Sequence, residues 1–312
     1  WRRNNGQRMT GKALDDAIAK RVKGAGLGLT FAVEMVRRTG VPVGLLPCAH
    51  GGTSMDQWSP ELRDQGGASL YGGMIRRIRA AGGAVTGVLW YQGESDANPK
   101  AAPEYKTKFE NLIGAVRRDT GVADLPCYCV QIGRFVNHTN LAEWNHVQEM
   151  QRQIEASTRR TGMVAAVDLS LDDAIHVGTD DLKRLGRRMA NLALRDLFPN
   201  QGEHSSLQAG PRPVSAVYRN GAIRVEFSGV NGRLQAPGRV GGFSIRAADG
   251  SDLPLIYRSS IDVAALYTVV LKIQGQIPEG ARLHYGYGKD PFCNVRDSRD
   301  MALPVFGPMA IE

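Results

Sequence analysis

The first two hundred residues alternate between short apolar runs and stretches whose apolar residues recur at helical spacing. The apolar runs predict buried strands over residues 41–47, 85–89, 125–132 and 163–169. Helical spacing predicts helices over residues 29–38, 69–81, 103–118 and 140–158, and a last helix that Thr179 or Asp180 caps and that continues to about residue 197. This alternation of strands and helices predicts a parallel sheet with helices on both faces.

The hydrophobic period changes after residue 213. Residues 198–213 contain three prolines and few large apolar residues, which is typical of a domain boundary. Apolar and polar residues then alternate with a period of two over residues 223–227, 243–246, 267–273 and 282–287. Asn220-Gly221 and Asp249-Gly250 are typical of hairpin turns. We therefore expect an α/β domain over residues 1–207 and a small antiparallel β domain, a sandwich, over residues 208–312.

Composition and charge exclude several classes of protein. The chain has 312 residues and is 42% hydrophobic, yet no apolar run approaches the ~20 residues of a membrane span. Its net charge of +8 is not concentrated on one predicted helix, so we expect no binding of nucleic acid. The four cysteines fit no zinc pattern, and we expect buried free thiols. Trp1 begins a basic, weakly periodic stretch without a targeting signal, and we expect that an upstream segment has been removed.

Polar loops follow three of the predicted strands. Residues 50–58 follow the first of these strands, residues 92–96 follow the second, and residues 170–176 follow the last. The carboxyl ends of parallel strands lie on one edge of a sheet, where ligands bind in open α/β folds. Each loop alone is more simply explained as a strand that ends in polar residues, but together they predict one site.

The side chains of these loops are typical of acyl transfer. In the D-x-x-H spacing of Asp173 and His176, the carboxylate can fix the imidazole tautomer and leave the other ring nitrogen as a base. Gly51-Gly52 allows backbone N–H groups to approach a substrate oxygen, and the Gln92 amide can donate to an oxyanion. Glu94 is either a second carboxylate for the histidine or an anchor of the Gly51 loop. A base, an orienting acid and oxyanion donors indicate catalysis by a serine nucleophile.

The motifs resemble those of the sialate O-acetylesterase family, a branch of the SGNH hydrolases. The most specific segment is Gly87-Val-Leu-Trp-Tyr-Gln-Gly-Glu-Ser-Asp96. Residues 51–58 are similar to another block of the family, and Asp173-Ala-Ile-His176 is similar to its last catalytic block. A helical block near Trp144 is matched only in part, because residues 145–148 depart from it. The resemblance extends over about residues 28–310.

This resemblance implies a three-layer α/β/α SGNH fold and an enzyme that removes acetyl groups from sialic acids or acetylated polysaccharides such as xylan. It implies neither a metal nor an organic cofactor, no membrane partner and an extracytoplasmic location, and it leaves the oligomeric state open. Carried over by motif, His176 is the general base and Asp173 or Glu94 is its acid partner. Gly52 and Gln92 are the expected donors to the oxyanion. Gly51, Thr53 and Trp58 are expected to contact the O-acetylated carbohydrate.

One element of the family pattern is missing. The family carries its nucleophile in a Gly-Gln-Ser-Asn block on the first strand, and this chain has only Gly6-Gln7 of that block. Three interpretations stay open. The block belongs to another segment, Ser54 or Ser95 replaces its serine, or the protein binds acetylated carbohydrate without hydrolysing it.

Overall fold

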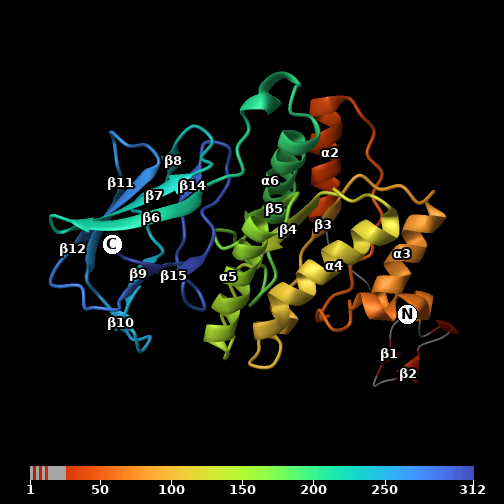
Figure 1. The fold of residues 1–312 in the computed structure, drawn as a ribbon, viewed down its shortest axis with the longest axis horizontal. Helices are drawn as coiled ribbons and strands as arrows, with labels where there is room; N and C mark the ends of the chain where they lie inside the picture. Colours follow the sequence, from red (N-terminus) through yellow and green to blue (C-terminus); the bar gives the residue numbers. More distant parts are fainter. Residues whose placement is uncertain (1–2, 5–6, 9–10, 13–25) are drawn as a thin grey trace.

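A sheet of three parallel strands forms the centre of the first two hundred residues in this computed structural model, which describes residues 3–4, 7–8, 11–12 and 26–312 (Figure 1). The strands are β3 (Val88–Trp90), β4 (Cys127–Gln131) and β5 (Thr161–Ala165), in the spatial order β3-β4-β5. Near the N-terminus, β1 (Arg3–Asn4) pairs with β2 (Gln7–Arg8). The prediction that residues 1–25 are a basic, weakly periodic stretch otherwise concerns positions that lie, for the most part, outside the described residues.

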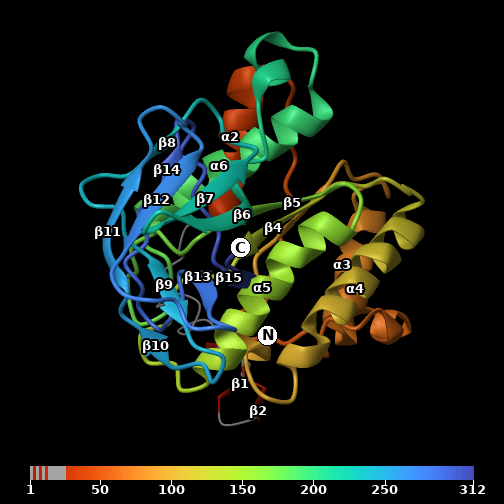
Figure 2. The ribbon, with the colours of Figure 1, turned by 60° about the vertical axis from the view of Figure 1, so that its left-hand side comes forward.

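Helices cover both faces of this sheet. They are α2 (Leu27–Thr39), α3 (Leu70–Ala80), α4 (Tyr105–Thr120), α5 (Leu141–Ser157) and α6 (Thr179–Leu197). Short 3-10 helices lie between them at η1 (Pro60–Ala68), η2 (Glu94–Asp96), η3 (Ala102–Glu104) and η4 (Gly202–Ser206). Figures 1 and 2 show α2 beside α6, and α3, α4 and α5 on the other side of the sheet. The predicted three-layer α/β/α architecture is confirmed.

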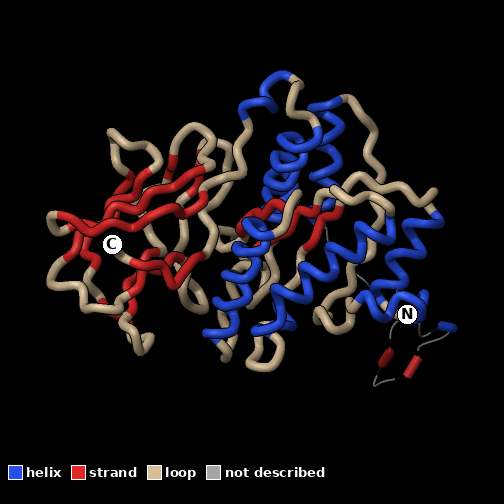
Figure 3. The backbone as a smooth tube through the Cα atoms, in the orientation of Figure 1, coloured by secondary structure: helices blue, strands red, loops and turns tan. Residues whose placement is uncertain are grey.

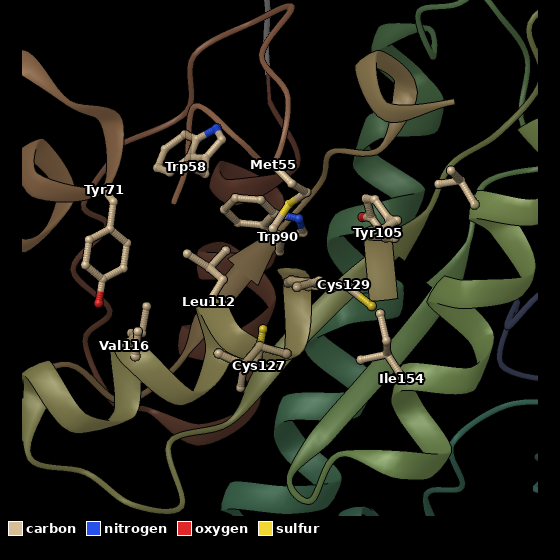
Figure 4. Packing of buried hydrophobic residues seen from close by; sticks show 14 of the residues in the cluster. Met55, Trp58, Tyr71, Trp90, Tyr105, Leu112, Val116, Cys127, Cys129 and Ile154 are labelled. Atoms are coloured by element: carbon tan, nitrogen blue, oxygen red, sulfur yellow. The ribbon is translucent and has the colours of Figure 1, made fainter. Parts of the chain in front are cut away.

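Alternate side chains of the strands supply two separate cores, as the period of a β-strand requires. Cys127, Cys129 and Met163 pack with the helices α3, α4 and α5. Tyr128 and Val130 point the other way and pack with α6. All four cysteines are free, as predicted, and Figure 4 shows two of them within the apolar packing between β4 and the helices. Burial raises the pKa of the Cys127 thiol to about 12, so this thiol stays protonated.

Two local predictions are wrong. Residues 41–47 form a loop and not a buried strand, and the side chains of Val41, Leu45 and Leu46 are exposed. The apolar run has strand character, but no strand among the described residues lies beside it to complete the ladder. The N-cap of α6 is Gly178, which has no side chain to cap with, so neither Thr179 nor Asp180 has the predicted role. Instead, acidic residues in the first turn interact favourably with the positive, N-terminal end of the helix dipole.

The chain after residue 211 forms two antiparallel four-stranded sheets that pack on a common apolar core (Figure 3). One has the order β10-β9-β13-β15, the other the order β11-β12-β7-β6, and β8 pairs with β14. The strands are β6 (Arg212–Arg219), β7 (Ala222–Ser228), β8 (Leu234–Gln235), β9 (Phe243–Arg246), β10 (Asp252–Leu253), β11 (Ile256–Ile261), β12 (Thr268–Ile273), β13 (Arg282–Tyr285), β14 (Arg296–Asp297) and β15 (Phe306–Ala310). We call residues 212–310 the β region. The domain boundary after residue 207 stays a prediction.

Direct hydrogen bonds attach the β region to the parallel sheet. The buried amide of Gln131, the last residue of β4, donates from Nε2 to the Val305 carbonyl and accepts from the Val305 N–H, both at 2.8 Å. The Arg212 guanidinium forms an ion pair with Glu155 of α5 and donates to the carbonyl of Met163 at 2.8 Å. The β region is therefore fixed against the carboxyl end of β4.

A buried histidine in the β region makes stability depend on pH. His284 of β13 is buried, and this burial, together with the charge of Arg246, lowers its pKa to about 4. The unfolded chain takes up this proton near the ordinary pKa of about 6.5. Stability from this group is therefore complete above about pH 6.5 and is lost as pH falls toward 4. From pH 7 to pH 5 we expect His284 to reduce the free energy of unfolding by about 2 kcal/mol.

Urea unfolding at the two pH values measures this effect. In the variant His284→Gln, the component of the pH dependence that belongs to the buried imidazole disappears. The matched control is His146→Gln, because His146 of α5 is exposed and its replacement should leave the pH dependence unchanged. Equal pH dependence in the wild type and in His284→Gln would show that the imidazole is not responsible.

Candidate active site

Residues 170–178, which we call the histidine loop, follow β5 and form a small hairpin. Leu171 pairs with Val177 in an isolated antiparallel bridge. The Asp172 N–H donates to the His176 carbonyl at 2.8 Å, and the Gly178 N–H donates to the Ser170 carbonyl at 3.0 Å. The hairpin thus presents Asp173 and His176 at its tip, beyond the carboxyl end of the strand.

The two residues form an ordered pair. Oδ2 of Asp173 lies 2.7 Å from Nδ1 of His176, and Oδ1 accepts from the backbone N–H groups of His176 and Ile175 at 2.8 and 2.9 Å. These bonds, the one from the His176 N–H first, lower the pKa of Asp173 to about 2. The side chains of His176 and Asp173 are 77% and 56% exposed. A carboxylate on Nδ1 leaves Nε2, which has no partner among the described residues, open as a base.

Glu94 lies close to this pair without bonding to it. Its carboxyl is partly buried, and burial raises its pKa, while the charge of His176 acts in the opposite direction. No hydrogen bond joins Glu94 to His176, so Asp173 is the carboxylate that contacts the imidazole. This geometry separates two carboxylates that the sequence could not rank.

The turn at Gly51-Gly52 is exposed, and the residues that follow it hold it in place. Gly52 has a φ of +69°, a left-handed conformation that glycine adopts without strain. The Thr53 hydroxyl donates to the His50 carbonyl at 2.8 Å and accepts from the indole N–H of Trp58 at 3.0 Å. The buried side chain of Thr53 therefore shapes the turn and has no free surface for a substrate.

Trp58 lies in the core. Its indole is only 4% exposed and packs edge-to-face against Trp90, with ring centroids 5.2 Å apart (Figure 4). The contact of Trp58 with the carbohydrate stays a prediction, and it requires this buried ring to become accessible. The packing of the two indoles instead fixes the loop of residues 53–58 to the end of β3.

The Gln92 amide faces the same loop. Its Nε2 donates to the Thr53 carbonyl at 3.0 Å and to Oδ2 of Asp96 at 2.5 Å, and its Oε1 is buried without a partner. Both amide protons are thus engaged, and donation to an oxyanion requires the amide to turn. The predicted oxyanion role of Gln92 stays a prediction, as does that of Gly52.

Asp96 is a site residue that the sequence argument did not single out. Its carboxylate is buried, and its two oxygens accept from the Met55 N–H at 3.1 and 3.0 Å in addition to the bond from Gln92. Burial is the main cause that raises the pKa of this carboxyl. Asp96 therefore ties two edge loops together. The available signal was its place as the last letter of the W-Y-Q-G-E-S-D string.

The candidate serines stand apart from the base. Ser54 directs its N–H to Oε1 of Gln57 at 3.0 Å, and its hydroxyl lies 3.5 Å from the same oxygen. Ser95 is exposed, and its carbonyl accepts from the Asn98 amide. Within residues 26–312, no serine hydroxyl donates to His176. The structure thus brings together a base and its acid partner, and it connects the Gly51 turn to the loop of residues 92–96.

Two further observations on the described residues concern metal binding and membrane spans. Among the residues that the structure describes, no three His, Cys, Asp or Glu side chains gather as a metal site would require. None of the described helices combines the length and the apolar character needed to cross a membrane.

Comparisons with known proteins show which proteins this chain is similar to. Residues 8–195 match the family model described as carbohydrate esterase, sialic acid-specific acetylesterase. A probable carbohydrate esterase of Arabidopsis thaliana is 32% identical over 187 residues, which cover 57% of this chain and 67% of that protein. The crystal structure of a carbohydrate acetylesterase from Xanthomonas citri is similar with a TM-score of 0.73 and 25% identity. The similarity covers 90% of this chain and 64% of the Xanthomonas chain.

Proposed function

Because the chain belongs to the family of carbohydrate esterases described as sialic acid-specific acetylesterases, we propose that it hydrolyses acetyl esters of carbohydrates through a serine acyl-enzyme. The observation that carries this proposal is the 2.7 Å contact between Asp173 and Nδ1 of His176, with Nε2 of the imidazole left open. In this mechanism His176 takes the proton of the attacking hydroxyl and returns it to the leaving sugar oxygen. Acetylated sialic acid and acetylated xylan are the proposed substrates, and an extracytoplasmic location is part of the proposal.

Asp173 is the proposed acid partner of His176. Its carboxylate holds the Nδ1 proton and stabilises the imidazolium that forms during attack. Because the pKa of Asp173 is about 2, the carboxylate is charged throughout the range in which a histidine base operates. The exposed N–H groups at Gly51-Gly52 are the proposed donors to the oxyanion, and Asp96 positions the loop that bears them.

We propose that the nucleophile comes from a segment other than residues 26–312, on a strand that pairs with the outer edge of β3. Three features of the described residues support such a strand. Val88 and Leu89 of β3 are only partly buried, whereas every residue of the central strand β4 is buried. Residues 41–47, an apolar run, form no strand, and Val41, Leu45 and Leu46 are exposed. The apolar side chains Leu29, Val33 and Val36 of α2 are exposed. A parallel strand there would end at the same carboxyl edge of the sheet as the histidine loop, next to residues 92–96 that follow β3.

Labelling with a fluorophosphonate and mass spectrometry of the peptides test this proposal. The probe marks a serine only where a base activates it and N–H donors receive the adduct. We expect this chain to show no adduct at Ser54 or Ser95, and a longer protein that includes the completing strand to show one adduct on that strand. His176→Ala should abolish that adduct, while His146→Ala, which replaces an exposed histidine of α5, should retain it.

The other outcomes select between the open interpretations. An adduct at Ser54 or Ser95 would mean that this chain supplies its own nucleophile. A folded, completed protein without any adduct would favour the second candidate function, a carbohydrate-binding protein. The observation that favours this candidate is the absence of a serine hydroxyl on His176 in the described part of the chain.

A further inference from the structure

A fourth loop lies at the carboxyl edge of the sheet, and the predicted site did not include it. Residues 132–140, which we call the β4 loop, follow β4. The Val136 N–H donates to the carbonyl of Ala174 at 3.0 Å, between Asp173 and His176 in the chain. The Arg134 guanidinium donates from Nη2 to the Leu169 carbonyl at 2.8 Å, just before the histidine loop begins. The β4 loop therefore contacts the histidine loop both at its base and at its tip.

The β region holds the β4 loop from the other side. The Lys289 carbonyl accepts from the Phe135 N–H at 3.2 Å, and the Asp290 carboxylate forms an ion pair with Nη1 of Arg134. The same segment is anchored to α5, because Oδ1 of Asn145 accepts from the Gly288 N–H at 3.2 Å. A continuous series of contacts thus runs from residues 286–290 through the β4 loop to the histidine loop.

These contacts matter because the side chains of the catalytic pair are not themselves held by burial. Both side chains of the pair are largely exposed, so apolar burial contributes little to their position. The position of an exposed hairpin tip depends on its hydrogen bonds and on the segments that contact it. At the base, the Asp181 carboxylate holds the Ser170 N–H at 2.6 Å. At the tip, the Val136 N–H bonds to the Ala174 carbonyl, and Ile175 packs against the apolar core.

We propose that residues 286–290 of the β region fix the position of the Asp173–His176 pair through the β4 loop, with Arg134 as the positioning residue. Arg134 makes no contact with the reacting atoms. Its guanidinium bonds both to the Asp290 carboxylate and to the Leu169 carbonyl, and so sets the distance between the β4 loop and the histidine loop. The consequence for catalysis rests on the proposed esterase function, whereas the positional coupling does not.

Amide hydrogen exchange, followed by NMR, tests the coupling without any need for activity. The reporters are the N–H groups of Ile175 and His176, which both donate to Oδ1 of Asp173. In Asp290→Ala we expect these two amides to exchange at least about tenfold faster, because the loop opens more often. Arg134→Ala should give the same or a larger increase, and Asp290→Glu should restore slow exchange by keeping the ion pair.

The matched control is Glu203→Ala. It removes an ion pair with Arg299 at 2.7 Å, which also connects the two parts of the chain, and one with Arg38 at 3.1 Å, and neither includes a residue of the histidine loop or of the β4 loop. This control should leave exchange at Ile175 and His176 unchanged. The proposal is overturned if Asp290→Ala speeds exchange only within residues 286–290, or if Glu203→Ala has an equal effect.

Kinetics then separate this proposal from the proposed function. In a preparation that hydrolyses acetyl esters, Asp290→Ala should lower kcat and leave KM nearly unchanged, since no substrate contact is lost. If the protein has no esterase activity but Asp290→Ala still speeds amide exchange, the coupling stands and the proposed function is contradicted. If the protein hydrolyses acetyl esters but Asp290→Ala leaves amide exchange at Ile175 and His176 unchanged, the proposed function stands and the coupling is overturned.

Discussion

Replacement of His176 by alanine is expected to reduce acetyl ester hydrolysis by about 10⁴-fold or more, because the attacking hydroxyl loses its proton acceptor. The thermal midpoint should change little, since the imidazole is exposed and Asp173 is its one side-chain partner within the described residues. Hydrolysis of p-nitrophenyl acetate and release of acetate from acetylated carbohydrate measure the effect. The matched control is His146→Ala, which removes an exposed histidine of α5 and should keep the wild-type rate.

A His176→Ala variant that retains more than about a tenth of the rate would contradict the assignment, because loss of a triad base costs several orders of magnitude. The same assay separates the two carboxylates. Asp173→Asn replaces the oxygen that holds Nδ1, and its effect should approach that of His176→Ala. Glu94→Gln removes a carboxyl that does not contact the imidazole, and its effect should be at least tenfold smaller.

The sequence was sufficient to predict those parts of the fold that depend on local pattern. The helices around the sheet and the strands β3, β4 and β5 follow from hydrophobic periodicity, and the hairpin turns from glycine-containing dipeptides. Residues 41–47 have the same apolar pattern as β4 but form no strand, because a strand also needs a neighbour to complete its hydrogen bonds. A pattern within one segment contains no information about that neighbour.

The site was predictable to a different extent. The D-x-x-H spacing placed a carboxylate on Nδ1 of His176 because both residues lie in one short loop. Trp58 and Gln92 had less predictable surroundings, because Trp90 packs on the first and Thr53 bonds to the second, and each of these partners comes from another segment. The sequence did not predict the β4 loop as part of the site for a similar reason. Its bond to the tip of the histidine loop joins two backbone groups, which any residue type can supply, and the Arg134 side chain bonds to the backbone carbonyl of Leu169, which comes from another segment.

A buried ion pair below the histidine loop is expected to have the largest effect on stability. Arg188 of α6 is buried, and its guanidinium binds both oxygens of the Asp168 carboxylate, at 2.8 and 2.6 Å. It also donates to the carbonyls of Ala165 and Asp300, and the latter residue belongs to the β region. One side chain therefore connects the end of β5, the start of the histidine loop and the β region.

Arg188→Met is expected to lower the free energy of unfolding by about 3–5 kcal/mol, because it leaves the Asp168 carboxylate buried with one fewer cation. Urea denaturation measures the loss, with Arg187→Met as the matched control. Arg187 is the preceding residue of the same helix and is exposed, so its replacement should cost less than about 0.5 kcal/mol. The double variant Arg188→Met/Asp168→Asn should recover part of the loss, because the uncompensated charge is gone. Equal destabilisation by Arg188→Met and Arg187→Met would show that the buried pair does not hold the three segments together.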